Sequence, residues 1–137
     1  MPDLNEQVRE FFAEYEKANA EFDVTKIASL YADVFMFAGP QGAQSVRKED
    51  FVKVLPKRKE FFKSSGLVSS KVEAVEASAL DARYTCAKVK WRMRFERAGA
   101  QAVESENFAT YILSSAGDSF QIVFQLDHQD LAKRIPE

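Results

Sequence analysis

One histidine and a small set of aromatic and amide side chains are the groups in this sequence that could carry chemistry. His128 is the only histidine, and an imidazole exchanges a proton near neutral pH, as a general base must. Strict alternation along residues 119–128 places His128 on the inner face of a strand and Asp127 on the opposite face. We therefore predict His128 as a candidate catalytic base at a pocket mouth. The alternative is a structural histidine, because no inward carboxylate can be placed beside it.

Several polar tips and rings are expected to face the same interior. Alternation along residues 103–114 turns Asn107 and Tyr111 inward, and Tyr15 falls on the apolar stripe of an N-terminal helix. A few polar groups among rings suit a flat, partly polar ligand. The alternative is a core filled by these rings, with the tyrosines bonded to backbone carbonyls. The candidate ligand-binding residues are Phe12, Phe37, Trp91, Met93, Asn107, Tyr111 and Phe124.

Helices are predicted in the first half of the chain. Apolar residues recur at helical spacing over residues 4–20, which predicts a long amphipathic helix. Asp23 can cap a short second helix over residues 24–33. A third helix is predicted from about residue 47 to residue 65, with a kink or break near Leu55, because Pro56 removes a backbone donor and crowds the preceding turn.

Strands are predicted mainly in the second half, where apolar residues alternate with polar ones. Residues 34–38 form a β-prone run, and residues 41–45 are a polar connection into the third helix. Four long strands cover residues 68–80, 83–97, 103–114 and 119–128. The sequence therefore predicts one α+β domain over residues 1–137, in which two to three N-terminal helices pack in a curved, mainly antiparallel sheet.

The outer face of the sheet carries a charge match and an apolar patch. A turn near Gly99 sets Arg94 opposite Glu104 and Arg92 opposite Glu106, which supports this register. The same face shows a patch that a monomer rarely exposes, so we predict a homodimer through the outer face of the sheet. The alternative is that the chain's own tail covers this patch. The patch residues are Phe108, Thr110, Ile112 and Val123.

Composition argues against several classes of function. The 19 basic and 21 acidic residues give a net charge of -2, so neither nucleic acid nor an anionic membrane is an expected partner. One cysteine and one histidine offer no recognisable metal site, and no phosphate-binding loop or other cofactor motif is present. The first ten residues lack a signal-peptide pattern and no run is long enough to span a membrane, so a cytoplasmic location is expected.

The order of the predicted elements is distinctive. A long helix is followed by a short Asp-capped helix that ends at Leu30-Tyr31-Ala32-Asp33, a strand that runs into Gly39-Pro40, a third helix and a four-strand meander. This order resembles the nuclear-transport-factor-2-like superfamily, whose fold is also described as cystatin-like, over nearly the whole chain. The resemblance implies a cone-shaped α+β fold around an apolar pocket, and it implies dimerisation.

Three positions decide how much of one member's chemistry the resemblance implies. Tyr15, eight residues before Asp23, resembles the phenol that donates to the steroid oxygen in the ketosteroid isomerases. It is therefore the second catalytic candidate beside His128. Gly39 and Ala109 fall where those enzymes carry a carboxylate base and a protonated carboxylic acid, so steroid isomerisation itself is not expected.

Two functions remain open at this point. The first is a SnoaL-like pocket protein that binds a hydrophobic or aromatic compound, or transforms it without a cofactor as an isomerase, cyclase or dehydratase would. The second is a non-enzymatic dimeric binding or association module with a filled core. An open interior favours the first function, and a closed interior favours the second.

Overall fold

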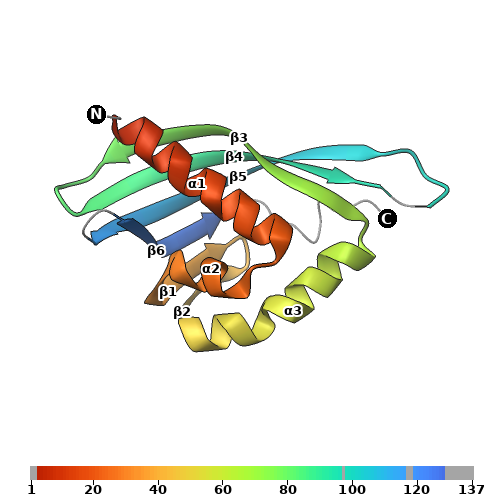
Figure 1. The fold of residues 1–137 in the computed structure, drawn as a ribbon, viewed down its shortest axis with the longest axis horizontal. Coiled ribbons are helices and arrows are strands. Elements are labelled where there is room, and N and C mark those ends of the chain that lie inside the picture. Colours follow the sequence, from red (N-terminus) through yellow and green to blue (C-terminus); the bar gives the residue numbers. More distant parts are fainter. Residues whose placement is uncertain (1–2, 97, 117–118, 129–137) are drawn as a thin grey trace.

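A curved six-stranded sheet with helices on one face makes up the fold of the computed structural model (Figure 1). The structure describes residues 3–96, 98–116 and 119–128. The helices are α1 (Leu4–Glu21), α2 (Val24–Ser29) and α3 (Lys48–Ser64). The predicted α+β class is confirmed. The strands are β1 (Tyr31–Gly39), β2 (Gly42–Arg47), β3 (Leu67–Ala79), β4 (Tyr84–Phe95), β5 (Val103–Ala116) and β6 (Ser119–Asp127).

The strands lie in the order β2-β1-β6-β5-β4-β3. Every neighbouring pair is antiparallel except β1 and β6, which are parallel and join the first hairpin to the last strand. α1 packs against β3, and α3 contacts β1, β2 and β3. The three described helices therefore lie against one face of the sheet (Figure 1).

The short helix α2 begins as predicted but ends early. The Asp23 side chain accepts a hydrogen bond from the Lys26 amide at 3.1 Å, which is an N-cap. The helix ends at Ser29. The Leu30 carbonyl already accepts a hydrogen bond from the Ile122 amide of β6 at 2.8 Å, so the chain has joined the sheet where the sequence predicts more helix.

Two other expectations for this half differ from the structure. The predicted polar connection at residues 41–45 forms most of β2, which pairs with β1 along its length. Its residues are mostly exposed at the edge of the sheet, so no apolar alternation marks the strand in the sequence. α3 runs unbroken through Pro56. Leu55 beside it is only 3% exposed, and its packing holds the helix on the core despite the missing N–H.

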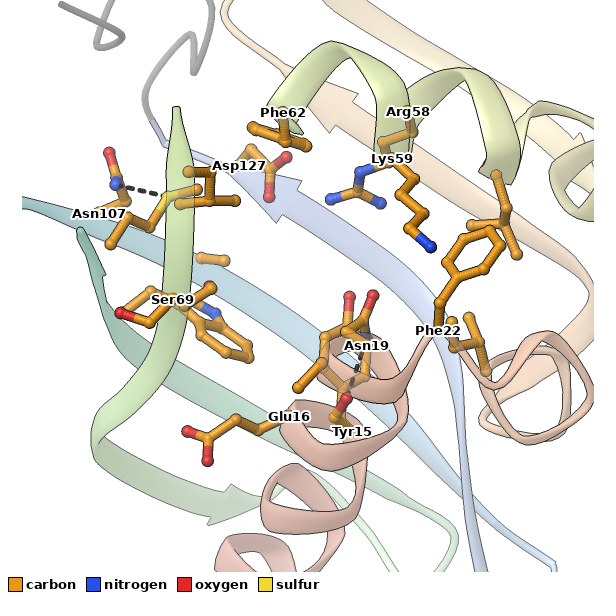
Figure 2. Close-up of a pocket in the computed structure, with 18 of the residues that line it drawn as sticks. Tyr15, Glu16, Asn19, Phe22, Arg58, Lys59, Phe62, Ser69, Asn107 and Asp127 are labelled. Carbon is orange, nitrogen blue, oxygen red and sulfur yellow. Dashed lines mark hydrogen bonds between the residues drawn. The ribbon is translucent and has the colours of Figure 1, made fainter. Parts of the chain in front are cut away.

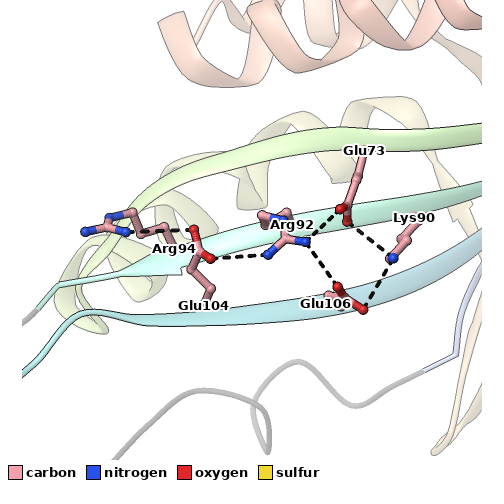
Figure 3. Close-up of polar contacts among 6 residues, drawn as sticks. All are labelled: Glu73, Lys90, Arg92, Arg94, Glu104 and Glu106. Atoms are coloured by element: carbon pink, nitrogen blue, oxygen red, sulfur yellow. Dashed lines mark hydrogen bonds and ion pairs between the residues drawn. The ribbon is translucent and has the colours of Figure 1, made fainter.

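The hairpin of β4 and β5 has the predicted register. Arg94 lies opposite Glu104 and Arg92 opposite Glu106, and on the outer face these charges form a network of ion pairs with neighbouring side chains (Figure 3). Gly99 in the connecting turn has a φ of 77°, a conformation that favours glycine. Alternate residues of β4 are buried as predicted, namely Ala87, Val89, Trp91, Met93 and Phe95.

A bulge in β6 interrupts the alternation on which the last predictions depend. Leu113 pairs with Ile122, whereas the preceding residue of β5, Ile112, pairs with Phe124. Val123 is therefore an extra residue in β6. An extra residue shifts every following side chain to the other face of the sheet.

The prediction that Phe124 and His128 face inward is wrong for this reason. Phe124 and Leu126 lie opposite outward-facing residues of β5, and His128 is exposed. Gln125 and Asp127 instead lie opposite inward-facing residues, and Gln125 is 3% exposed. The bulge thus places an amide and a carboxyl on the face that the helices cover.

Candidate functional site

A cavity of about 390 Å³ lies between α1, α3 and the covered face of the sheet. Figure 2 shows polar groups from different elements around it, including Tyr15 of α1, Arg58 of α3 and Asp127 of β6. Its volume falls in the range of small-molecule pockets. Lining residues that are exposed show where the cavity opens to solvent, and they are Asn19, Ala20, Lys59, Lys63, Val68 and Phe108.

Several of the predicted site residues line this cavity. Trp91 Nε1 donates a hydrogen bond to the Tyr111 hydroxyl at 3.3 Å, and the ring centroids of Tyr15 and Trp91 are 5.6 Å apart. The structure brings these side chains together, whereas their roles in binding stay predictions. The lining residues from the predicted set are Tyr15, Trp91, Met93, Asn107 and Tyr111.

Three predicted ligand-binding residues lie elsewhere. Phe12 is 0% exposed and packs in the core, with its ring centroid 4.7 Å from that of Tyr111. Phe37 of β1 is half-buried and does not line the cavity. Phe124 is on the outer side of β6 because of the bulge.

The predicted base, His128, is also separated from the cavity. Its Nε2 lies 2.7 Å from the Thr110 hydroxyl, and both residues line a groove on the outer face of the sheet with Phe108. The structure therefore does not bring His128 together with Tyr15.

A chain of hydrogen bonds joins cavity-lining groups to the buried Tyr31. The Tyr31 hydroxyl donates to Gln125 Oε1 at 2.9 Å, and the Tyr15 hydroxyl lies 2.9 Å from the Tyr31 oxygen. A phenol carries one hydrogen, so Tyr15 must donate to Tyr31. Gln125 Nε2 in turn donates to Asp127 Oδ1 at 3.2 Å. Tyr15 therefore offers a ligand its oxygen lone pairs, and not the hydrogen that the resemblance implies.

Tyr111 is the phenol that can donate into the cavity. Its oxygen accepts from Trp91, and its hydrogen has no acceptor in the described part of the chain. Burial, and then the nearby Tyr15 and Asp127, raise the pKa of Tyr111 well above its ordinary value. Tyr111 is therefore a neutral hydrogen-bond donor at physiological pH.

Asp127 is a carboxyl whose pKa is raised above its ordinary value. Burial raises its pKa, while the hydrogen bond from Gln125 and the charges of Arg58 and His128 lower it in part. The net direction is upward, so this carboxylate is a stronger base than an exposed aspartate.

The surroundings of Asp127 relate it to the two positions where the isomerases carry carboxyls. Asp127 lies opposite Ala109, and a Cβ placed on Gly39 would lie 3.8 Å from the Asp127 carbonyl oxygen. A carboxyl is therefore present between the two positions, on a strand from which the sequence did not predict it.

Arg58 projects from α3 into the cavity (Figure 2). It is half-buried, and its guanidinium carbon lies 5.7 Å from the centroid of the Phe62 ring. It makes no hydrogen bond or ion pair with any residue that the structure describes. Beside it, Lys59 Nζ lies 4.4 Å from the Phe22 ring centroid, a cation–π contact.

Asn107 adds a buried amide with one unused acceptor. Its Nδ2 donates to Met93 Sδ at 3.1 Å and to Ser105 Oγ at 3.2 Å. Its Oδ1 is buried and has no donor among the described residues. A buried acceptor of this kind is a contact point for a donor on a bound molecule or a water.

Sequence reasoning missed four groups of this site for different reasons. The alternation rule could not reveal the bulge that turns Gln125 and Asp127 inward. Tyr31 fell inside the predicted second helix. Arg58 did have a signal, because it follows Leu55 by three residues and precedes Phe62 by four, a spacing that puts all three on one helix face.

Neither a metal-binding cluster nor a membrane-spanning helix occurs among the described residues. Across residues 3–96, 98–116 and 119–128, no group of three or more His, Cys, Asp or Glu side chains is placed to hold a metal ion. Of the helices that the structure describes, none combines the length and apolar character that crossing a membrane requires.

A family comparison matches most of the chain. Residues 5–130 match the model of a family described as NTF2-like protein (DUF6841). No curated protein matches the sequence.

Solved structures share the fold at low sequence identity. Aln2 from a Streptomyces species is 14% identical with a TM-score of 0.77, over 99% of this chain and 98% of that chain. An NTF2-like protein with a cystatin-like fold from Novosphingobium aromaticivorans is 11% identical with a TM-score of 0.72, over 96% and 88%. A ketosteroid isomerase-like protein from Erwinia carotovora atroseptica is 14% identical with a TM-score of 0.70, over 93% and 97%. At such identities these similarities show the fold alone.

Proposed function

From the premise that this chain belongs to the NTF2-like family DUF6841, we propose that its cavity binds a small, largely hydrophobic molecule with an aromatic or flat apolar body. Membership confirms the predicted superfamily but names no ligand, since one fold carries many functions. The observation that carries the proposal is the cavity of about 390 Å³, lined by Trp91, Met93 and Tyr111 with a few convergent polar groups. An open interior supports this function over a module with a filled core.

Trp91 provides a direct test, because it is the only tryptophan in the chain. Titration with the neutral probe 3-phenylpropanamide should give a saturable change in Trp91 fluorescence. Ala109→Leu adds apolar volume to the cavity lining and should weaken binding. Ala79→Leu, at an exposed position of β3, is the matched control and should not. A fluorescence signal that never saturates would contradict the proposal.

A second candidate function is proton transfer to or from the bound molecule. It rests on the raised pKa of Asp127 and on the available hydrogen of Tyr111. Asp127 would take a proton from the carbon next to a carbonyl group, and the C–H electron pair would move toward the carbonyl oxygen. Tyr111 would donate a hydrogen bond to that oxygen. This pair replaces the predicted pair of His128 and Tyr15.

Hydrogen exchange would test this second function. In D₂O the protein should accelerate exchange of the protons next to the carbonyl of 4-phenylbutan-2-one, followed by NMR. Asp127→Asn should remove the acceleration while Trp91 fluorescence still reports binding. Asp33→Asn, a change at an exposed carboxyl, should leave exchange unchanged. Equal exchange by the wild type and the Asp127 variant would exclude Asp127 as the base.

We also propose the homodimer through the outer face of the sheet. The bulge moves Phe124 and Leu126 to the side of Ile112, which enlarges the apolar patch, and Phe108 is 46% exposed. Paired charges of β3, β4 and β5 lie on the same face (Figure 3) and would form a polar rim.

Sedimentation velocity would test the dimer. Ile112→Asp should shift the protein to a monomer, because a carboxylate would lie unpaired in the interface. Leu80→Asp, at a residue that is 57% exposed in the β3–β4 connection, should leave the dimer intact. A wild-type protein that stays monomeric at every concentration would overturn this proposal.

A further inference from the structure

Arg58 places a positive charge in the cavity. Its guanidinium points into the cavity from α3 (Figure 2), and no residue in the described ranges bonds to it or pairs with it. The guanidinium has five N–H donors in a planar fork. A partly buried charge with unused donors is costly to the fold alone, and it suits a ligand that supplies the missing acceptors.

Asp127, the acidic group that interacts with Arg58, does not use these donors. The two side chains form no ion pair within 4.0 Å, and Asp127 Oδ1 accepts from Gln125 instead. Although the charge of Arg58 lowers the pKa of Asp127 in part, burial outweighs it. The donors of Arg58 are therefore available to a bound molecule.

Charges around the cavity favour an anion as well. Lys59 and Lys63 stand at the exposed opening, on the same helix as Arg58. The acidic lining residues are Glu16 and Asp127, and the Glu16 carboxylate already accepts from the Val72 amide at 2.6 Å. Three cations thus face two carboxyls in a protein whose overall charge is -2.

We infer that the molecule bound in this cavity carries a carboxylate, and that Arg58 binds it through its guanidinium. The inference rests on the proposed ligand-binding function and names the ligand class as an aromatic or alkyl carboxylic acid. Its apolar body packs against Trp91 and Met93, which line the cavity. A planar carboxylate matches the fork of an arginine with two parallel hydrogen bonds.

The test compares two probes of the same shape, one of which is an anion and the other neutral. 3-Phenylpropanoate and 3-phenylpropanamide have the same shape, and calorimetry measures the affinity of each for the full chain at neutral pH. The wild-type protein should bind the acid about tenfold more tightly than the amide, as a charge-assisted pair in a partly buried site would give. Arg58→Met keeps an unbranched stem of similar length and should remove this preference while leaving amide binding in place.

Matched variants separate charge from packing. Lys57→Met removes one positive charge from the neighbouring exposed residue of α3 and should keep the preference. Arg58→Lys keeps the charge and should retain part of it, and this variant serves if Arg58→Met fails to fold in a thermal melt.

Each remaining outcome overturns the inference, and each does so distinguishably. Equal wild-type affinity for acid and amide refutes the carboxylate while the proposed pocket function stands. A preference that survives in Arg58→Met refutes the role of Arg58. Absence of binding by both probes refutes the pocket function, and the inference falls with it.

Discussion

An arginine lies on each side of the sheet, Arg92 on the outer face of β4 and Arg58 on α3 over the covered face, and their surroundings differ. On the outer face, Arg92 lies within hydrogen-bond distance of three glutamates (Figure 3), at 2.6 Å from Glu73, 3.1 Å from Glu106 and 3.2 Å from Glu104. On the covered face, Arg58 has no carboxylate within 4.0 Å among the described residues. The pairing register and the alternation of side chains along the strands explain why Arg92 is surrounded by carboxylates. No described residue neutralises Arg58 in the same way, which is why we infer that its guanidinium binds a ligand.

The same contrast extends to the aromatic residues of the covered face. Phe12 is enclosed by other rings, whereas Trp91 and Tyr111 border the cavity. We therefore expect packing and ligand binding to depend on different side chains of this face, and variants should separate the two.

The largest expected effect is on packing. Phe12→Ala should lower the free energy of unfolding by about 3–5 kcal/mol, because a fully buried ring is lost and leaves a cavity. Urea denaturation measures it. Phe61→Ala, at a ring that is 46% exposed, should cost less than about 1 kcal/mol. If Phe12→Ala lost probe affinity with little loss of stability, Phe12 would be a ligand contact, and the division between packing and binding would fail.

A smaller effect is expected at the centre of the hydrogen-bond chain. Tyr31→Phe removes the bonds to Tyr15 and Gln125 and leaves buried polar atoms without partners, at a cost of about 1–3 kcal/mol. Urea denaturation again measures it. Tyr84→Phe, at a half-buried tyrosine, is the control. Equal effects of the two changes on the free energy of unfolding would show that these hydrogen bonds contribute nothing to stability.

A pH-dependent change is expected at Asp127. Its pKa in the folded protein is raised above the ordinary 3.8, so the folded state holds the proton more tightly than the unfolded state. The contribution of Asp127 to stability is therefore greatest below the ordinary pKa and is lost as the pH rises through the raised one. Asp127→Asn cannot ionise, so it should melt at a higher temperature than wild type at pH 7 and at the same temperature under strongly acidic conditions.

Thermal melts across this pH range give the measurement for Asp127. Glu10→Gln, a change at an exposed carboxyl, should show no such pH-dependent difference in melting temperature from the wild type. A variant that is less stable than wild type at pH 7 would mean that attraction by Arg58 outweighs burial.

The smallest effect is expected on the outer face. Arg92→Met should cost less than about 1 kcal/mol, because exposed ion pairs contribute little, and the cost should shrink further in high salt. It should leave the acid-to-amide preference unchanged, in contrast to Arg58→Met. Calorimetry and urea denaturation measure both quantities. If Arg92→Met abolished the preference, overall charge rather than contact would explain anion binding.

Much of the architecture could be predicted because the signals are local. The period of apolar residues and the cap at Asp23 predicted α1 and the start of α2. Opposite charges across a turn predicted the register of β4 and β5, and with it the inward placement of Trp91 and Tyr111. Strand β2 was not predicted, because an exposed edge strand needs no apolar alternation.

The sequence by itself determined the α+β class, the helical and strand halves, and the side chains that β4 and β5 turn inward, since each follows from periodicity along one segment. The tertiary structure alone decided the face on which Asp127 and His128 lie. One extra residue, Val123, is accommodated between β1 and β5, and a bulge depends on the pairing of both neighbours rather than on the strand's own pattern. The cavity that Arg58 of α3 and Asp127 of β6 both line likewise exists only in the tertiary structure, because a helix and a strand far apart in the sequence must come together to form it.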